Sequence, residues 1–411
     1  MTDFTLLYID PGTGSMLFSV FISLFALLYF ASRAFFIKLR VLFAGGKNEK
    51  RGESVPYVIY CEGKQYWNTF RPVVEEFERR NLPLLYLTSA EDDPINKLEL
   101  KHVRTEYIGA GNKAFARLNL LEADVCLMTT PGLDVFQLKR SKGVKHYAHV
   151  LHMVNDATLY KRYGLDYFDS VLLSGDYQKE DLRYLEKLRG LPEKRLVTVG
   201  SPYLDVLAEK ISAAEEQSSK EKKGFTVLVS PSWGSSGLLS CYGKKLLDPL
   251  AKSGFEIIVR PHPQSKTVEK ELLDSLQAEY AGNEKIKWDF APDNIVSLSK
   301  ADIMISDFSS ITLDYAFLRE KPFLSVIGRF DARPYDAGKV PRELWQFRVL
   351  PDIGKELREE DFGEIKNIIE GMTEDPDAGR KRLDAKNQAW QHRGEAGRRI
   401  ADFMVSVREE L

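Results

Sequence analysis

The chain has 411 residues, enough for two α/β domains and further segments. Apolar residues make up 44% and aromatic residues 11%, which supports packed cores and excludes a chain that is disordered throughout. The 58 basic and 60 acidic residues nearly balance, so we expect no nucleic-acid partner, and an anionic ligand would need a local site. The three cysteines are Cys61, Cys126 and Cys241, and their wide spacing predicts neither a disulfide framework nor a zinc site.

An uncharged segment near the amino terminus predicts a membrane anchor. Residues 11–32 hold no charged side chain, and about 20 apolar residues suffice to cross a bilayer as a helix. Basic residues follow the segment, and because basic flanks stay in the cytoplasm, we predict a single-pass protein of the cell membrane with the rest of the chain cytoplasmic. A cleaved secretory signal would carry its basic residues before the apolar segment. The basic flank comprises Arg33, Lys38, Arg40, Lys47, Lys50 and Arg51.

Beyond the anchor, short apolar runs alternate with amphipathic stretches. This alternation predicts βαβ units and parallel sheets. In the first half of the chain, helices are predicted at 67–80, 177–188 and 202–210. The strands predicted there cover residues 55–61, 84–88, 103–108, 125–129, 146–151, 170–174 and 196–200.

A charged stretch without an apolar face, residues 212–224, predicts an exposed connection between two domains. A second alternating unit follows it, so the sequence predicts an α/β fold with two Rossmann-like lobes. Its predicted strands are 226–230, 256–260, 286–289, 302–306 and 323–327, and its predicted helices are 241–252, 268–280, 295–299 and 311–319.

The carboxyl-terminal part has a weaker pattern. Residues 344–350 are predicted as a strand or a loop, and residues 361–372 and 385–407 as helices. The predicted organisation is an anchor with its basic flank at 1–50, a first lobe at 51–211, a second lobe at 225–384 and a final helix at 385–411.

One candidate site follows the predicted strand at 256–260. Ligands of open α/β sheets bind beyond the carboxyl ends of the strands. This strand ends in Arg260-Pro261-His262-Pro263, where the prolines restrict the backbone around His262 and Arg260 offers a forked cation suited to phosphate. The plainer interpretation is a strand-end turn with a solvated histidine.

A second candidate site lies where the predicted strand 302–306 meets a helix. The connecting residues are Ser306-Asp307-Phe308-Ser309-Ser310. Free N–H groups and the positive end of the helix dipole attract anions to such a position. Helix capping alone would explain one of the two adjacent hydroxyls, Ser309 and Ser310, but not the pair.

A loop rich in glycine and serine follows the predicted strand 226–230. It begins Pro231-Ser232-Trp233-Gly234, and it could approach a phosphate closely or cover a base. A simple turn remains the alternative. The loop lacks the lysine spacing of a P-loop, so ATP hydrolysis is not predicted.

Half of the six histidines, His146, His149 and His152, fall within seven residues. On a strand, His146 and His152 share a face. Neighbouring carboxylates do not complete a convincing ligand set, so no metal is predicted. His152 ends the strand and is the candidate general base, because an imidazole titrates near neutrality. A structural role is the alternative for each of the three.

These motifs, in this order, resemble the CDP-glycerol glycerophosphotransferases, the teichoic-acid polymerases and primases of the GT-B fold. The resemblance covers residues 147–327 and includes Gly200-Ser201-Pro202-Tyr203-Leu204-Asp205 and Asp314-Tyr315. It implies a GT-B fold with an acceptor lobe at 51–211 and a donor lobe at 225–384. It also implies His152 as the base on the acceptor hydroxyl and His262 as the catalytic group at the donor phosphates. The substrate-binding residues that it implies are Arg260, Ser306, Asp307, Ser309, Ser310, Ser232, Trp233, Gly234 and Asp205.

The resemblance further implies a reaction and its partners. The expected reaction transfers glycerol phosphate, or a related polyol phosphate, from a CDP-linked donor to a hydroxyl of a lipid-linked or polymeric envelope acceptor at the cytoplasmic membrane. CMP is released, and neither a metal nor another cofactor is expected. The alternatives are a nucleotide-sugar glycosyltransferase of the same fold acting on a lipid-linked or envelope glycan, a membrane-bound scaffold with a degenerate cleft, and a soluble epimerase with similar lobes.

Overall fold

The computed structural model describes residues 21–25, 27–29, 32–33, 54–218, 224–291, 293–326, 330–372 and 376–411. The chain divides into two compact units, Met1–Glu53 and Ser54–Leu411. In the first unit, the described residues are helical and exposed. No helix among the described residues is long and apolar enough to cross a membrane. Most of the predicted span at 11–32 lies outside the described residues.

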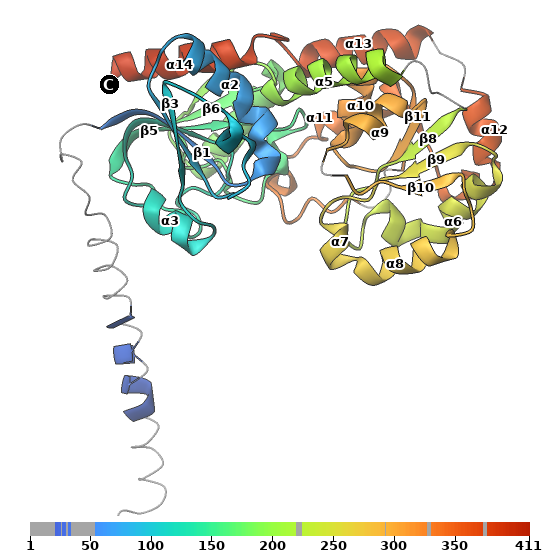
Figure 1. The fold of residues 1–411 in the computed structure, drawn as a ribbon, viewed down its shortest axis with the longest axis horizontal. Helices are drawn as coiled ribbons and strands as arrows, with labels where there is room; N and C mark the ends of the chain where they lie inside the picture. Colours follow the sequence, from blue (N-terminus) through green and yellow to red (C-terminus); the bar gives the residue numbers. More distant parts are fainter. Residues whose placement is uncertain are drawn as a thin grey trace, which may run out of the picture. The chain divides into compact units, whose positions relative to one another are not determined.

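The second unit begins with a seven-stranded parallel sheet in the order β3-β2-β1-β4-β5-β6-β7 (Figure 1). Its central strands β1, β2 and β4 are mostly apolar and buried, as expected for parallel strands covered by helices on both faces, whereas the edge strands β3 and β7 are more polar and more exposed. The strands are β1 (Val55–Cys61), β2 (Leu84–Thr88), β3 (Val103–Tyr107), β4 (Glu122–Met128), β5 (Gly143–Val150), β6 (Ser170–Leu173) and β7 (Arg195–Thr198), and the helices are α2 (Trp67–Arg79), α3 (Asn112–Leu118), α4 (Lys179–Arg189) and α5 (Pro202–Ser218).

A six-stranded parallel sheet follows in the order β10-β9-β8-β11-β12-β13. The prediction of two parallel sheets in an α/β fold is therefore confirmed. The strands are β8 (Thr226–Val229), β9 (Glu256–Val259), β10 (Ile286–Trp288), β11 (Ile303–Ser306), β12 (Phe323–Ser325) and β13 (Lys355–Glu356). The helices are α6 (Leu238–Lys252), α7 (Ser265–Val268), α8 (Lys270–Glu279), α9 (Ile295–Lys300), α10 (Ile311–Arg319), α11 (Trp345–Ile353), α12 (Ile365–Glu370), α13 (Pro376–Ala389) and α14 (Ala396–Glu410). We call the parts built on the first and second sheets the first and second lobe.

Several predicted elements differ in the structure. The stretch 344–350, predicted as a strand or a loop, mostly lies in helix α11, whose residues Trp345, Leu350 and Ile353 are buried. Helix α5 runs to Ser218, into the predicted connection, because its Ala and Glu residues favour helix.

The single helix predicted at 385–407 is wrong, because the structure has two helices there. Between α13 and α14 the chain turns through two left-handed residues, His392 with φ 51° and Gly394 with φ 74°. Gly394 tolerates this conformation at little cost. The turn lets α13 pack against α10 and α11 of the second lobe and α14 against α2 of the first (Figure 1).

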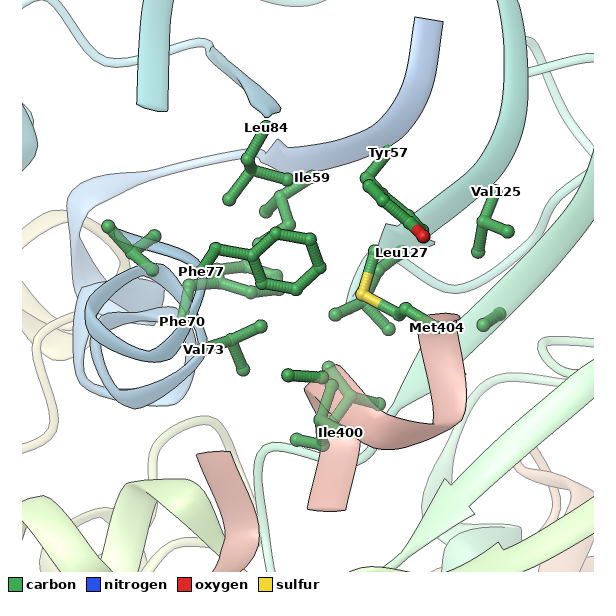
Figure 2. Packing of buried hydrophobic residues seen from close by; sticks show 14 of the residues in the cluster. Tyr57, Ile59, Phe70, Val73, Phe77, Leu84, Val125, Leu127, Ile400 and Met404 are labelled. Atoms are coloured by element: carbon green, nitrogen blue, oxygen red, sulfur yellow. The ribbon is translucent and has the colours of Figure 1, made fainter. Parts of the chain in front are cut away.

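Helix α14 completes the core of the first lobe. Ile400 and Met404 face Phe70 and Phe77 of α2 beneath the strands of the first sheet (Figure 2). All four side chains are fully buried. The carboxyl-terminal helix is therefore part of the first lobe's packing, although it follows the second lobe in sequence.

Met404→Ala is expected to destabilise the fold by about 2–5 kcal/mol, because it removes buried apolar contacts and leaves a cavity. Chemical denaturation of the full chain followed by circular dichroism measures the change. Glu409→Ala, at an exposed position of the same helix, is the matched control and should stay within about 0.5 kcal/mol of the parent. Equal losses from both variants would contradict the packing role of α14.

Candidate active site

A cavity of about 660 Å³ lies between the two lobes, at the carboxyl ends of their parallel strands. On the second-lobe side, its walls follow directly after β8, β9, β10 and β11. On the first-lobe side, residues from the segments after β1 and β2 and from α2 and α5 complete the lining. This is where an open parallel sheet presents its ligand-binding loops.

Four of the predicted site residues, Arg260, His262, Ser309 and Ser310, line this one cavity. They follow two strands, β9 and β11, which lie on either side of β8 in the second sheet. A guanidinium, an imidazole and a helix amino terminus thus face a common space.

The Arg260 guanidinium is already engaged by the protein. One nitrogen, Nη1, donates to Asp289 Oδ2 at 2.5 Å and the other, Nη2, donates to the Ala291 carbonyl oxygen at 2.8 Å. Burial opposes ionisation of Asp289, but hydrogen bonds from Ser297, the Ala291 N–H and Arg260 outweigh it and hold the pKa of Asp289 below its usual value. Arg260 therefore has a fixed position at the cavity wall, and its charge is partly balanced.

The His262 ring has a defined tautomer. Its Nδ1 accepts a hydrogen bond from the Gln264 backbone N–H at 3.2 Å, so in the neutral ring the proton resides on Nε2. Burial lowers the pKa of His262, which favours this neutral form at pH 7. Trp233 stacks against the ring, with centroids 6.1 Å apart and an interplanar angle of 28°. His262 therefore offers an N–H donor from a ring of restricted orientation.

The start of α10 keeps both serine hydroxyls available. Ser310 is the N-cap residue, but no side-chain hydrogen bond caps the helix. Simple capping therefore does not explain this pair, and both Ser309 and Ser310 line the cavity. Hydroxyls and the amino-terminal N–H groups of a nine-residue helix can together bind a phosphoryl group.

Asp307 has a different place from the one predicted. Its carboxylate is buried and accepts from the N–H and hydroxyl of Ser232, from the Leu238 N–H and from the Ser309 N–H, at 2.8–3.1 Å. It thereby ties the loop after β8 to the start of α10. Neither Asp307 nor the fully buried Ser306, whose hydroxyl donates to the Ser230 carbonyl oxygen at 2.6 Å, is among the cavity residues.

The loop after β8 forms a flap next to the cavity. Ser232 is held by Asp307, and Gly234 adopts φ 88°, a conformation that favours glycine. Trp233 is 46% exposed and contacts His262. None of these three residues lines the cavity itself. The loop contacts the cavity residues indirectly, through the packing of Trp233 on His262 and through Asp307, which binds both Ser232 and the Ser309 N–H.

The structure does not bring Asp205 to this cavity. Its carboxylate accepts from Trp390 Nε1 at 2.8 Å, from the Gly394 N–H at 2.9 Å and from the Ala396 N–H at 3.3 Å. It lines a separate cavity of about 700 Å³ beside the turn between α13 and α14. Asp205 thus anchors the carboxyl-terminal turn, and its neighbour Tyr203, on another face of α5, lines the interlobe cavity instead.

The three clustered histidines have separate surroundings. His146 Nε2 lies 2.8 Å from Ser170 Oγ, and His149 is fully buried with its Nε2 3.2 Å from the Tyr160 hydroxyl. His152 lies in the loop after β5 and packs on Tyr66, with ring centroids 4.9 Å apart. Tyr66 lies between two cavity residues in sequence, Gln65 and Trp67, and His152 is partly exposed but is not itself among the cavity residues. No three His, Cys, Asp or Glu side chains among the described residues are placed to hold a metal ion.

Burial keeps two of these rings neutral. It lowers the pKa of His152 to about 4 and that of His149 well below its usual value, to which the nearby His152 ring contributes. The unfolded chain takes up protons on both rings below pH 6.5, whereas the folded chain does not. The stability that these rings contribute is therefore present above pH 6.5 and is lost as the pH falls toward 4.

Between pH 6.5 and pH 4.5, the unfolding free energy of His149→Phe should fall less steeply with decreasing pH than that of the parent. The two slopes should differ by about 1.4 kcal/mol per pH unit. Denaturant titrations of the variant and the parent at matched pH values measure the difference. Burial raises the pKa of Asp156 to about 6 and that of Asp314 to about 7, which gives slopes of the opposite sign, but both carboxyls are common to the two proteins. Parallel stability curves would show that His149 is not held neutral.

The sequence reading missed several cavity residues. Asp314 is 5% exposed and lines the cavity one helical turn after Ser310, but its motif, Asp314-Tyr315, predicts no role for it. The lysines Lys64, Lys210 and Lys266 and the carboxyl Asp293 were not singled out at all. Helical spacing from Ser310 is a signal that would have found Asp314, whereas the lysines gather only through the fold.

Comparisons with known proteins agree with this architecture. Residues 154–405 match the family model described as CDP-Glycerol:Poly(glycerophosphate) glycerophosphotransferase. This span is more than half of the chain and starts just after His152. No curated protein sequence matches the chain.

Among solved structures, the wall teichoic acid polymerase TagF is similar at 17% identity, with 86% of this chain and 89% of that chain covered and a TM-score of 0.56. A TagF variant soaked with CDPG for 30 minutes gives 17% identity, coverages of 90% and 93%, and a TM-score of 0.59. A UDP-GlcNAc 2-epimerase from Neisseria meningitidis bound to UDP-GlcNAc gives 13% identity, coverages of 86% and 100%, and a TM-score of 0.54.

At these identities the structural likenesses show the fold, which is a two-lobed α/β architecture of the GT-B kind with two parallel sheets. The family match covers the second lobe, the cavity's histidine and serine pair, and the carboxyl-terminal helices. The chain is a transferase that belongs to the CDP-glycerol:poly(glycerophosphate) glycerophosphotransferase family.

Proposed function

We propose that the chain transfers glycerol phosphate, or a related polyol phosphate, from a CDP-linked donor to a hydroxyl of a membrane-associated cell-envelope acceptor and releases CMP. The observation that carries the proposal is the convergence of Arg260, His262, Ser309 and Ser310 on one interlobe cavity. A pyrophosphate needs several fixed donors at close quarters, and this wall supplies an imidazole N–H, two hydroxyls and a helix amino terminus.

The charge of the cavity supports an anionic donor. Four cationic side chains, Lys64, Lys210, Arg260 and Lys266, line it together with three carboxyls, Asp289, Asp293 and Asp314. Burial raises the pKa of Asp314 to about 7, so this carboxyl is partly neutral at pH 7 and the cations prevail. Local cations of this kind can offset the charge of two phosphoryl groups.

The proposed chemistry is an in-line displacement at the donor's β-phosphorus. The acceptor oxygen forms a new bond to this phosphorus as the bond to the bridging oxygen breaks, and CMP leaves with the electron pair. His152 Nε2 takes the proton of the acceptor hydroxyl, while His262 Nε2–H and the start of α10 hold the pyrophosphate oxygens. Positioning of the two substrates and fixed hydrogen-bond donors are the main contributions a protein makes to such a transfer.

Donor binding to the full chain in detergent tests the proposal. Calorimetric titrations with CDP-glycerol, CDP, UDP-GlcNAc and UDP should give tighter binding for the cytidine compounds. In membranes supplied with a synthetic lipid-linked glycerol phosphate acceptor, CDP-glycerol should yield CMP in an acceptor-dependent manner. Preference for UDP-GlcNAc with release of UDP would instead support a nucleotide-sugar glycosyltransferase, and binding of none of them would support a scaffold.

We further propose that residues 11–32 anchor the protein in the cell membrane as a single span, with the second unit in the cytoplasm. The uncharged stretch and its basic flank support this arrangement. The anchor would raise the local concentration of a lipid-linked acceptor at the cavity. Protease protection in sealed right-side-out vesicles should leave the second unit intact until the membrane is opened. Digestion of intact vesicles would overturn the orientation.

A further inference from the structure

The ring of His152 is surrounded by hydroxyl groups. His152 follows β5, and its ring contacts the hydroxyls of Thr129 and Tyr160. Thr129 directly follows β4, and Tyr160 follows the short helix Ala157–Leu159. The tyrosine ring of Tyr66 covers one side. The polar contacts that the structure describes for this ring, at 2.8 Å and 3.1 Å, are both to hydroxyl oxygens and both involve Nδ1.

Proton accounting at Thr129 determines the direction of its contact with His152. The hydroxyl carries one hydrogen, and it donates this hydrogen to the Val150 carbonyl oxygen at 2.8 Å. The same Oγ1 lies 2.8 Å from His152 Nδ1 and has no second hydrogen to offer. Two lone pairs at this distance would repel each other, so Nδ1 must carry the hydrogen and donate to Thr129. Backbone pairing of neighbouring strands β4 and β5 holds both partners in place.

Tyr160 is compatible with the same arrangement. Its hydroxyl oxygen lies 3.1 Å from His152 Nδ1 and 3.2 Å from His149 Nε2. The phenol can donate to His149 Nε2 and accept a weaker branch of the hydrogen bond from His152 Nδ1. Burial raises the pKa of Tyr160, so the phenol keeps its proton. The groups facing the His152 ring are thus Tyr66, Thr129, Tyr160 and His149, which are neutral at pH 7.

We propose that Thr129 is a positioning residue that holds His152 in its Nδ1–H tautomer and leaves the Nε2 lone pair free to accept the proton of the acceptor hydroxyl. The base role of His152 in this statement rests on the proposed function. The tautomer itself does not, since it follows from the contacts of Thr129, Val150 and His152.

The two candidate catalytic histidines thus differ in the protonation of Nε2. His262 receives the Gln264 N–H at Nδ1 and presents a proton at Nε2, whereas His152 donates from Nδ1 and presents a lone pair at Nε2. One ring is set to donate to a phosphoryl oxygen and the other to take a proton. The His152 ring is oriented by a hydroxyl, whereas a carboxylate commonly orients a catalytic histidine. No negative charge at this position therefore raises the pKa of His152.

Nitrogen NMR of the full chain labelled with ¹⁵N-histidine measures the tautomers directly, because the chain has six histidines and each is assignable by substitution. His152 should show a protonated Nδ1 and an unprotonated Nε2, and His262 the reverse. Thr129→Val, which keeps the shape but removes the hydroxyl, should move His152 toward a mixture of tautomers. Thr129→Ser, which keeps the hydroxyl, should restore the parental spectrum. An Nε2–H tautomer of His152 in the parent would overturn the proposal.

Kinetics with CDP-glycerol and the synthetic lipid-linked acceptor give a second readout. Thr129→Val should lower kcat about tenfold, as expected for the loss of one orienting hydrogen bond, with the KM for CDP-glycerol unchanged and Thr129→Ser close to the parent. An unchanged kcat together with an unchanged tautomer in Thr129→Val would overturn the positioning role. If the tautomer shifts as expected but the parent releases no CMP, the proposed function fails while the positioning role of Thr129 stands.

Discussion

His262→Ala is expected to lower kcat/KM for transfer from CDP-glycerol by about 10²–10³-fold, because one preorganised hydrogen-bond donor to a developing phosphate charge is lost. The ring cannot be replaced by water at equal strength, since Trp233 and the Gln264 N–H give it a fixed orientation that a water molecule lacks. The loss should appear in donor binding as well as in turnover, because His262 lines the cavity. Steady-state CMP release and calorimetric titration with CDP measure the two components.

His102→Ala is the matched control for this prediction. It removes an imidazole from the segment before β3. The hydrogen bonds described for this residue involve its backbone, since its N–H donates to Glu78 and its carbonyl oxygen accepts from the Leu84 N–H, so both survive loss of the side chain. Transfer by this variant should equal that of the parent. Undiminished CMP release by His262→Ala in the presence of acceptor would remove His262 from the mechanism.

His152→Ala is expected to lower kcat by about 10²–10⁴-fold, the usual contribution of a positioned general base. Affinity for CDP should be retained, because His152 is not among the residues that line the cavity with Arg260 and His262. This separation of turnover from donor affinity distinguishes His152→Ala from His262→Ala. Single-turnover CMP release and calorimetry with CDP make the comparison, and a loss of CDP affinity equal to the loss of turnover would contradict it.

The pH profile gives an independent check on His152. Burial lowers its pKa to about 4, so the ring is in its basic form throughout the range from pH 5 to pH 8. His152 should therefore cause no fall in the kcat/KM of the parent near pH 6.5. The pH profiles of the parent and of His152→Ala should have the same shape around that pH. Such a fall, present in the parent and absent from the variant, would mean that the ring is solvated and titrates normally.

Much of the fold could be predicted from the sequence because parallel strands and their helices leave local patterns. The runs at 55–61 and 84–88 coincide with β1 and β2, and the run at 311–319 coincides with α10. The motifs Arg260-Pro261-His262-Pro263 and Ser309-Ser310 could also be found, because residues that follow parallel strands meet at one sheet edge. The carboxyl-terminal helices were harder, because the break at Gly394 depends on contacts with Asp205, which is far away in sequence.

Two residues predicted to bind substrate do not line the cavity, and contacts with residues distant in sequence again explain the difference. Asp205 and Asp307 stand in the motifs that predicted substrate binding, yet both carboxylates accept hydrogen bonds from backbone N–H groups and stabilise loops. A motif shows that a polar side chain is present at a turn. It does not show whether the side chain faces the ligand or the turn's own backbone, and that choice depends on where the free N–H groups lie.

The sequence by itself determined the two-lobed α/β class, the family, and the polar motifs at the strand ends of the second lobe, since alternation of strands and helices and strand-end motifs are local properties of the chain. Only the tertiary structure decided that Thr129 contacts His152, that Asp205 anchors α14, and that Lys64, Lys210 and Lys266 share a cavity with His262. These are contacts between residues tens to hundreds of positions apart. Their geometry depends on the order of strands in each sheet and on how the lobes pack, which no local pattern encodes.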